Sequence, residues 1–139
     1  MIDREKFAVW ASSNAAGQVV CGVATIARGL SYFPPLVDQE RKAAHYLETM
    51  LPPAWWGVIW VAFGLVCVAA ATSRRFAPQA VGLCVGIHAA WGMSFLAVQL
   101  FEPDKPRAWV SGLSYWLICF LIVWGFSRRR LAPVEFRRG

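Results

Sequence analysis

Three long stretches without a charged residue constrain this chain more than any other feature. They cover residues 54–72, 79–100 and 108–126. Each exceeds the roughly 18 apolar residues that a helix needs to cross a bilayer. A helix is required there because the bilayer interior has no water to satisfy free backbone groups. Charged residues make up only 16% of the chain, too few to cover a soluble globule. The sequence therefore predicts an all-α integral membrane bundle, with residues 1–139 forming a single membrane domain.

A fourth helix is predicted over about residues 8–30, and this one is amphipathic. Its small and polar residues recur at alternating intervals of three and four, which places them on one face of a helix: Ala11, Asn14, Gln18, Cys21, Thr25 and Arg28. We call Asn14, Gln18, Thr25 and Arg28 the polar seam. Either the helix crosses the membrane and turns the seam toward the other helices, or it lies flat in the interface. Its length favours crossing, which gives four membrane helices, against three if it is interfacial.

The segment between the first two predicted membrane helices has proline pairs at both ends, Pro34-Pro35 and Pro52-Pro53. Proline at both ends is typical of helix boundaries. Apolar residues within the segment share one face and charged residues occupy the others. The sequence predicts a short amphipathic helix over residues 36–51, lying on the membrane surface.

The basic residues predict the orientation. With four crossings and a cytoplasmic N-terminus, nine of the 14 Lys and Arg residues lie on the cytoplasmic side: Arg4, Lys6, Arg74, Arg75, Arg128, Arg129, Arg130, Arg137 and Arg138. The outer side then holds Arg28, Arg41, Lys42, Lys105 and Arg107. Such an excess marks the cytoplasmic side of a membrane protein. We predict a multi-pass protein of the cytoplasmic (inner) membrane with both termini in the cytoplasm, including a basic tail over residues 127–139. Basic clusters that directly follow apolar runs do not form a nucleic-acid interface.

One ionisable side chain, His88, lies near the middle of a predicted membrane helix. Such residues are candidates for proton transfer, metal binding or haem ligation. Each of these roles needs a partner, and the three uncharged stretches contain no Asp, Glu, Lys or second His. We interpret His88 as a neutral intramembrane residue that is hydrogen-bonded to a neighbouring helix.

Small residues recur every fourth position along residues 79–100, at Gly82, Gly86, Ala90 and Ser94. We call these four residues the small-residue ridge. A ridge of this kind lets two helix backbones approach closely, which drives helix association in lipid. The sequence predicts a helix-packing surface here and leaves open whether the partner helix belongs to the same chain or to another copy.

Enzymatic motifs are absent from the sequence. It has no G-x-S-x-G, H-E-x-x-H, P-loop or dinucleotide-binding fingerprint. The four cysteines, Cys21, Cys67, Cys84 and Cys119, lie in apolar stretches without a C-x-x-C pair, so they are interpreted as small core residues. We therefore predict a non-enzymatic protein with no catalytic residues, no metal site and no cofactor.

Several cues give the chain a stylistic likeness to known proteins. The basic clusters consist of arginine and not lysine: Arg74-Arg75, Arg128 to Arg130 and Arg137-Arg138. Alanine, valine and tryptophan are abundant, and residues 45–60 read HYLETMLPPAWWGVIW. In these respects the chain resembles the small multi-helix membrane proteins of actinobacteria and their phages. The resemblance implies a setting and transfers no site residue.

Two functional hypotheses follow, both with the lipid bilayer and a membrane protein as partners and neither with nucleic acid. The first is a self-associating protein of the holin or pore type, in which the polar seam would line the pore. The second is an accessory or structural subunit of a larger membrane complex, or a phage protein that modifies the envelope. Toxicity on expression distinguishes them, because a pore would depolarise the host.

Overall fold

A computed structural model describes residues 10, 13–38, 40–73, 75–102, 104 and 107–128, and all regular elements in these ranges are helical. Four α-helices form the bundle: α2 (Asn14–Leu30), α3 (Pro53–Ala69), α4 (Ala77–Phe101) and α5 (Ala108–Arg128). Two short 3-10 helices, η1 (Tyr46–Thr49) and η2 (Ala70–Thr72), lie between them. The side chain of Ser13 caps α2 by accepting a hydrogen bond from the N–H of Ala16. Prolines occupy the first turns of α3 and α4, where a missing N–H costs nothing.

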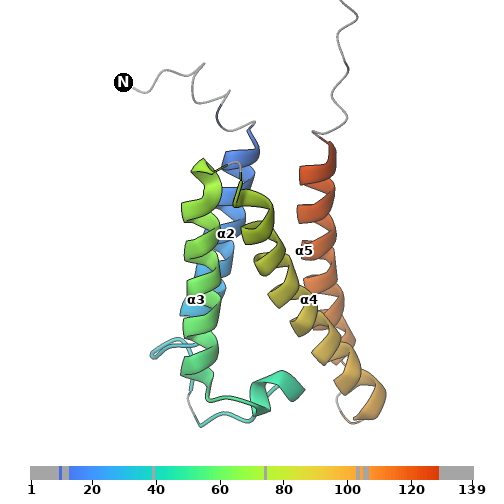
Figure 1. The fold of residues 1–139 in the computed structure, drawn as a ribbon. Coiled ribbons are helices and arrows are strands. Elements are labelled where there is room, and N and C mark those ends of the chain that lie inside the picture. Colours follow the sequence, from blue (N-terminus) through green and yellow to red (C-terminus); the bar gives the residue numbers. More distant parts are fainter. Residues whose placement is uncertain are drawn as a thin grey trace, which may run out of the picture.

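The four helices alternate in direction and form two closely packed pairs, α2 with α3 and α4 with α5 (Figure 1). The start of α2 and the end of α5 lie at the same end of the bundle, which we call the terminal end. The described residues of segments 31–52 and 102–107 lie at the opposite end, the loop end (Figure 1). Toward the terminal end, α5 diverges from α4, whereas toward the loop end α4 diverges from α3 (Figure 1).

Four glycines hold α2 against α3. A Cβ added at Gly64 would lie 2.6 Å from the carbonyl oxygen of Gly22, and a Cβ added at Gly29 would lie 2.8 Å from the carbonyl oxygen of Gly57. Gly22 and Gly29 are seven residues apart on α2, as Gly57 and Gly64 are on α3, so both pairs meet in one antiparallel register. Backbones this close make dense van der Waals contact, which is the main attraction between helices in lipid.

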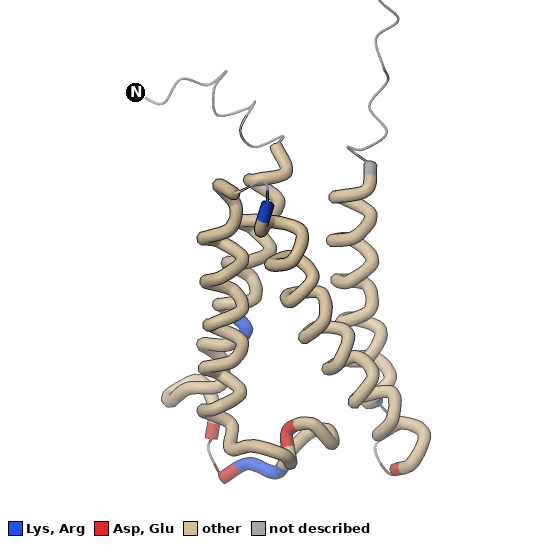
Figure 2. Tube along the Cα trace, viewed as in Figure 1, with Lys and Arg blue, Asp and Glu red and all other residues tan. Residues whose placement is uncertain are grey.

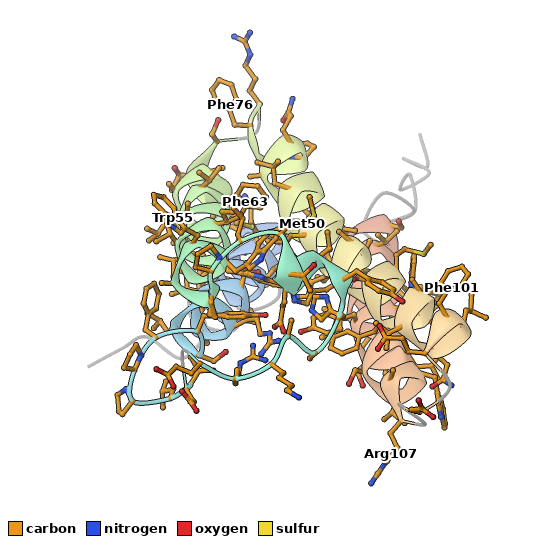
Figure 3. The ribbon with its side chains drawn as sticks, turned by 90° about the horizontal axis from the view of Figure 1, so that it is seen from below. Met50, Trp55, Phe63, Phe76, Phe101 and Arg107 are labelled. Atoms are coloured by element: carbon orange, nitrogen blue, oxygen red, sulfur yellow. The ribbon has the colours of Figure 1, made fainter. Side chains whose placement is uncertain are left out.

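The predicted surface helix over residues 36–51 is wrong. The described part of this segment contains only the single 3-10 turn η1, and the rest is extended chain and turns. Viewed from the loop end, η1 and Met50 cross the gap between α3 and α4 (Figure 3). The segment is thus folded into the bundle, where its polar groups bond inward, and this contact overrides the weak amphipathic pattern. The predicted first helix is observed from Asn14 to Leu30, and residues 8, 9, 11 and 12 of its predicted range lie outside the described residues.

Among the described residues, three helical segments are long and apolar enough to span a membrane: Pro53–Thr72, Ala77–Phe101 and Ala108–Ser127. They correspond to the predicted stretches 54–72, 79–100 and 108–126. The acidic residues of the described chain all lie on the segments at the loop end, while Arg75 lies at the terminal end (Figure 2). The basic tail predicted over 127–139 is outside the described residues beyond Arg128.

Candidate functional site

A network of polar side chains fills the loop end of the bundle between α2, α4 and segment 31–52. We call it the loop-end cluster, and it consists of Arg28, Tyr32, Arg41, His45, Glu48, Trp91 and Ser94. Tyr32, His45 and Trp91 are at most 2% exposed. The sequence singled out Arg28 and Ser94 for other reasons and did not connect any of these residues.

Glu48 is the anion of the loop-end cluster. Its carboxylate accepts two hydrogen bonds from the guanidinium of Arg41, at 2.8 and 3.1 Å, and one from the N–H of Ala44 at 2.8 Å. The hydroxyl of Tyr32 donates a further bond of 2.8 Å. Burial alone would raise the pKa of Glu48, but the bonds from Arg41, Ala44 and Tyr32 outweigh it and lower the pKa to about 2. A carboxylate held ionised in this way binds cations and hydrogen-bond donors. It is a poor general base at neutral pH, because its low pKa gives it little affinity for a proton.

Tyr32 links this ion pair to the helices. Its hydroxyl accepts a 3.1 Å bond from the indole N–H of Trp91 on α4 and a 3.4 Å bond from the guanidinium of Arg28 on α2. The guanidinium of Arg28 also lies 5.1 Å from the centre of the Tyr32 ring and 5.8 Å from that of Tyr115 on α5. One aromatic residue therefore joins α2, α4 and the loop, and burial raises the pKa of its phenol.

His45 and Ser94 attach η1 to α4. The Ser94 hydroxyl oxygen accepts a 3.0 Å bond from the N–H of Leu47 and lies 3.0 Å from Nδ1 of His45. With Glu48 3.8 Å from Nε2 of His45, the order serine, histidine, carboxylate resembles a hydrolytic triad by residue type. That 3.8 Å separation exceeds a hydrogen bond, Glu48 is committed to Arg41, and Ser94 is only 7% exposed. The geometry supports a structural connection in preference to acyl transfer.

The polar seam of α2 faces the inside of the bundle for most of its length. Gln18 is 2% exposed and donates a 2.9 Å bond to the backbone carbonyl of Cys67 on α3. Thr25 is fully buried and bonds to the carbonyl of Cys21. Arg28 belongs to the loop-end cluster, and Asn14 is exposed. Gln18 and Thr25 thus have partners within the chain.

His88 lies midway along α4 and borders an open cavity of about 350 Å³ between α2, α4 and α5. Its Nδ1 donates a 2.7 Å bond to the carbonyl oxygen of Cys84, one turn earlier on the same helix. The ring also meets Trp60 edge to face at 4.8 Å. The hydrogen bond shown for His88 is therefore within α4, whereas the sequence analysis expected a bond to a neighbouring helix. The cavity also borders Asn14 and Cys21, and its wall on α5 includes Gly125 and Phe126.

The small-residue ridge of α4 is divided by the structure. Ser94 is covered by η1, whereas Gly82, Gly86 and Ala90 are exposed. No described atom lies within 4 Å of a Cβ added at Gly82 or Gly86. Close contacts between the described helices use other glycines, and the packing role of the ridge stays a prediction.

Three cysteines meet in the core at the terminal half of the bundle. Cys21, Cys67 and Cys84 come from α2, α3 and α4, and their sulfur atoms all lie within 4.8 Å of one another. All three are buried free thiols. Their spacing in sequence follows no metal-binding motif. Each cysteine lies on a different helix, and only the helix packing brings the three together.

Comparison with protein-family models, with curated proteins and with solved structures finds no match for this chain.

Proposed function

We propose that this chain is a non-enzymatic, multi-pass protein of the cytoplasmic membrane that associates with further copies of itself through the exposed part of the small-residue ridge. The observation that carries the proposal is the contrast between glycines. Added Cβ atoms would meet neighbours at 3.3 Å or less at Gly22, Gly29, Gly57, Gly64, Gly92 and Gly112. They would meet nothing within 4 Å at Gly82, Gly86 and Gly125, and of these three only Gly82 and Gly86 lie one turn apart on the same helix. Most helical glycines in this chain are therefore used for close contact.

The exposed faces of the neighbouring helices strengthen this contrast. Outward positions on α5 carry large apolar side chains suited to lipid, such as Leu117, Phe120 and Trp124. Glycine at a lipid-facing position would lose helix propensity, by about 0.5–1 kcal/mol relative to alanine, and gain no packing. A second copy packed on Gly82, Gly86 and Ala90 would recover that loss through close backbone contact.

A closed assembly is favoured over a pore along the polar seam. Gln18 and Thr25 are buried and bonded within the chain, and the loop-end cluster occupies the opposite end of the bundle. A holin-type pore would have to form between copies. Expression in a host whose membrane potential is monitored tests this point, because a closed assembly leaves the potential unchanged.

Self-association is tested by cross-linking of the full chain in native membranes. In a background with the four cysteines replaced by alanine, Ala90→Cys should form a disulfide-linked dimer under mild oxidation. Val123→Cys, on an exposed face of α5, is the matched control and should remain monomeric. Adding Gly86→Leu should abolish the Ala90→Cys dimer, whereas Gly125→Leu, also without a neighbour within 4 Å, should not. Equal cross-linking at positions 90 and 123, or none at position 90, would refute the proposal.

The proposed orientation is tested separately. Reporters that are active only in the cytoplasm, fused to residue 1 and to residue 139 in turn, should both be active. Activity at residue 139 alone would mean three crossings with an interfacial α2. Inactivity at residue 139 would reverse the orientation.

A further inference from the structure

We propose that Cys21, Cys67 and Cys84 form a three-sulfur site for a soft, thiophilic metal ion such as monovalent copper. The site is independent of self-association. Thiolate sulfur selects such ions, because soft ligands bind soft metals. Three converging thiols on three helices provide a ligand set that a solitary buried cysteine does not.

The spacing of the sulfur atoms fits trigonal coordination. With metal–sulfur bonds of about 2.3 Å, three ligands around one ion lie about 4.0 Å from each other. The three sulfur atoms already lie within 4.8 Å of one another, so side-chain adjustments of less than 1 Å would close the site. Structural zinc sites use four ligands, and the group contains three, which favours an ion that accepts three-coordinate geometry.

Hydrogen bonds hold the ligand positions in place. Gln18 and Cys67 bond reciprocally: the Gln18 amide donates to the Cys67 carbonyl at 2.9 Å, and the Cys67 thiol donates to the Gln18 carbonyl at 3.6 Å. The Cys84 thiol donates to the carbonyl of Phe63 at 3.7 Å. These contacts join α2 to α3 and α4 to α3 at the site itself, as outer contacts do around metal ligands.

The cavity between α2, α4 and α5 provides an entry route. Cys21 borders this cavity, while Cys67 and Cys84 are fully buried behind it. His88 borders the same cavity, and because its Nδ1 donates to the Cys84 carbonyl, the lone pair of a neutral ring is on Nε2. An ion entering from the terminal end would meet these two residues before reaching the other two sulfur atoms.

Charge balance determines the protons released. A monovalent ion that replaces one thiol proton leaves the site neutral. One sulfur then binds as a thiolate, which is the strong ligand, and the two remaining thiols bind more weakly through sulfur lone pairs. Loss of all three protons would leave a net charge of −2 in an apolar interior, which is strongly unfavourable. Binding should therefore release one proton per ion, and copper remains in the +1 state throughout.

The test is an anaerobic titration of the full chain in nanodiscs with Cu(I), in competition with a chromophoric Cu(I) chelator. We expect one ion per chain, release of one proton, and an X-ray absorption spectrum with sulfur neighbours at about 2.3 Å. Cys21→Ala, Cys67→Ala and Cys84→Ala should each weaken binding on the order of 100-fold, at least as much as the loss of an outer contact. Cys119→Ala is the matched control, since this fourth buried thiol bonds to Val85 and lies outside the group, and its affinity should stay within about twofold.

Circular dichroism and chromatography establish that each variant is folded. A folded wild-type chain that leaves all copper with the chelator would overturn the proposal, as would equal affinities of Cys67→Ala and Cys119→Ala. Stronger binding of Zn²⁺ than of Cu(I), or loss of the ion in His88→Ala, would replace the three-sulfur site by a four-ligand one. Isolation with two of the three thiols joined as a disulfide, and no copper binding after reduction, would also reject it.

Discussion

Replacement of Gly64 by alanine should destabilise the bundle by forcing α2 and α3 apart. The new Cβ would lie 2.6 Å from the carbonyl oxygen of Gly22 and 2.8 Å from the backbone nitrogen of Ile26. Because these are backbone atoms, the helices must separate by on the order of 0.5–1 Å to restore ordinary contact. Overpacking of this kind costs about 1–3 kcal/mol, and the better helix propensity of alanine offsets about 0.5–1 kcal/mol. The net loss in unfolding free energy should be about 1 kcal/mol, within a range of about 0–2.5 kcal/mol.

Gly86→Ala is the matched control, because its Cβ would have no described neighbour within 4 Å. In dilute, monomeric protein it should be neutral or stabilising by up to about 1 kcal/mol. Unfolding in mixed micelles of rising SDS content, followed by tryptophan fluorescence, measures both variants. The losses in unfolding free energy caused by Gly22→Ala and Gly64→Ala should add up to less than their sum in the double variant. Both new methyl groups crowd the same contact, so the helix separation forced by one makes room for the other. Equal stability of Gly64→Ala and Gly86→Ala would refute the reasoning.

Three further predictions concern the polar groups. Tyr32→Phe should lower the unfolding free energy by about 1–3 kcal/mol in the same assay, because the partners of a buried hydroxyl are left unsatisfied. Tyr46→Phe, at an exposed position, should lower it less. Equal losses in the two variants would contradict the central place of Tyr32 in the loop-end cluster. Folding lowers the pKa of Glu48 from 4.5 to about 2, so its contribution to stability is complete above about pH 4.5 and is lost as the pH falls toward 2. The hydrogen-exchange protection of segment 40–50, measured relative to the intrinsic exchange rate at each pH, should fall over this interval, and Glu48→Gln should remove the pH dependence. In a cysteine-free background, Asn14→Cys should react with a water-soluble thiol reagent and Gln18→Cys should be protected, while rapid reaction at both would restore the pore hypothesis.

The long uncharged stretches predicted the helical fold well because their signal is local. Each of the stretches 54–72, 79–100 and 108–126 lies almost entirely within one observed helix or its 3-10 extension. The amphipathic first helix was also recognisable, and the structure shows its seam turned inward at Gln18 and Thr25. Segment 36–51 was misjudged because its amphipathic pattern is short, and contacts with α2 and α4 determine its conformation.

Helix pairing was harder to predict, because the sequence contains two competing glycine patterns. The four-residue repeat on α4 predicted a packing surface, but the close contacts between α2 and α3 use glycines that are seven residues apart. Gly22 and Gly29 on one helix, and Gly57 and Gly64 on the next, have equal spacing and meet in an antiparallel pair. Two matched seven-residue intervals, which correspond to about two helical turns, were the available signal. The loop-end cluster and the cysteine group have no comparable signal in the sequence, since their members are brought together only by the tertiary packing of several helices.

The glycine contact between α2 and α3 has a consequence for how the chain is made. At about 1.5 Å per residue, the 17 residues of α2 extend about 26 Å, less than the roughly 30 Å of a hydrocarbon core. Alone in lipid, α2 would expose the amide of Gln18, whose acceptor is the carbonyl of Cys67 on α3. We therefore expect α2 to remain at the translocon or the membrane surface until α3 has been synthesised. The two helices would then enter the bilayer as a hairpin, and an insertion assay should find α2 stably integrated only in nascent chains that extend past residue 72.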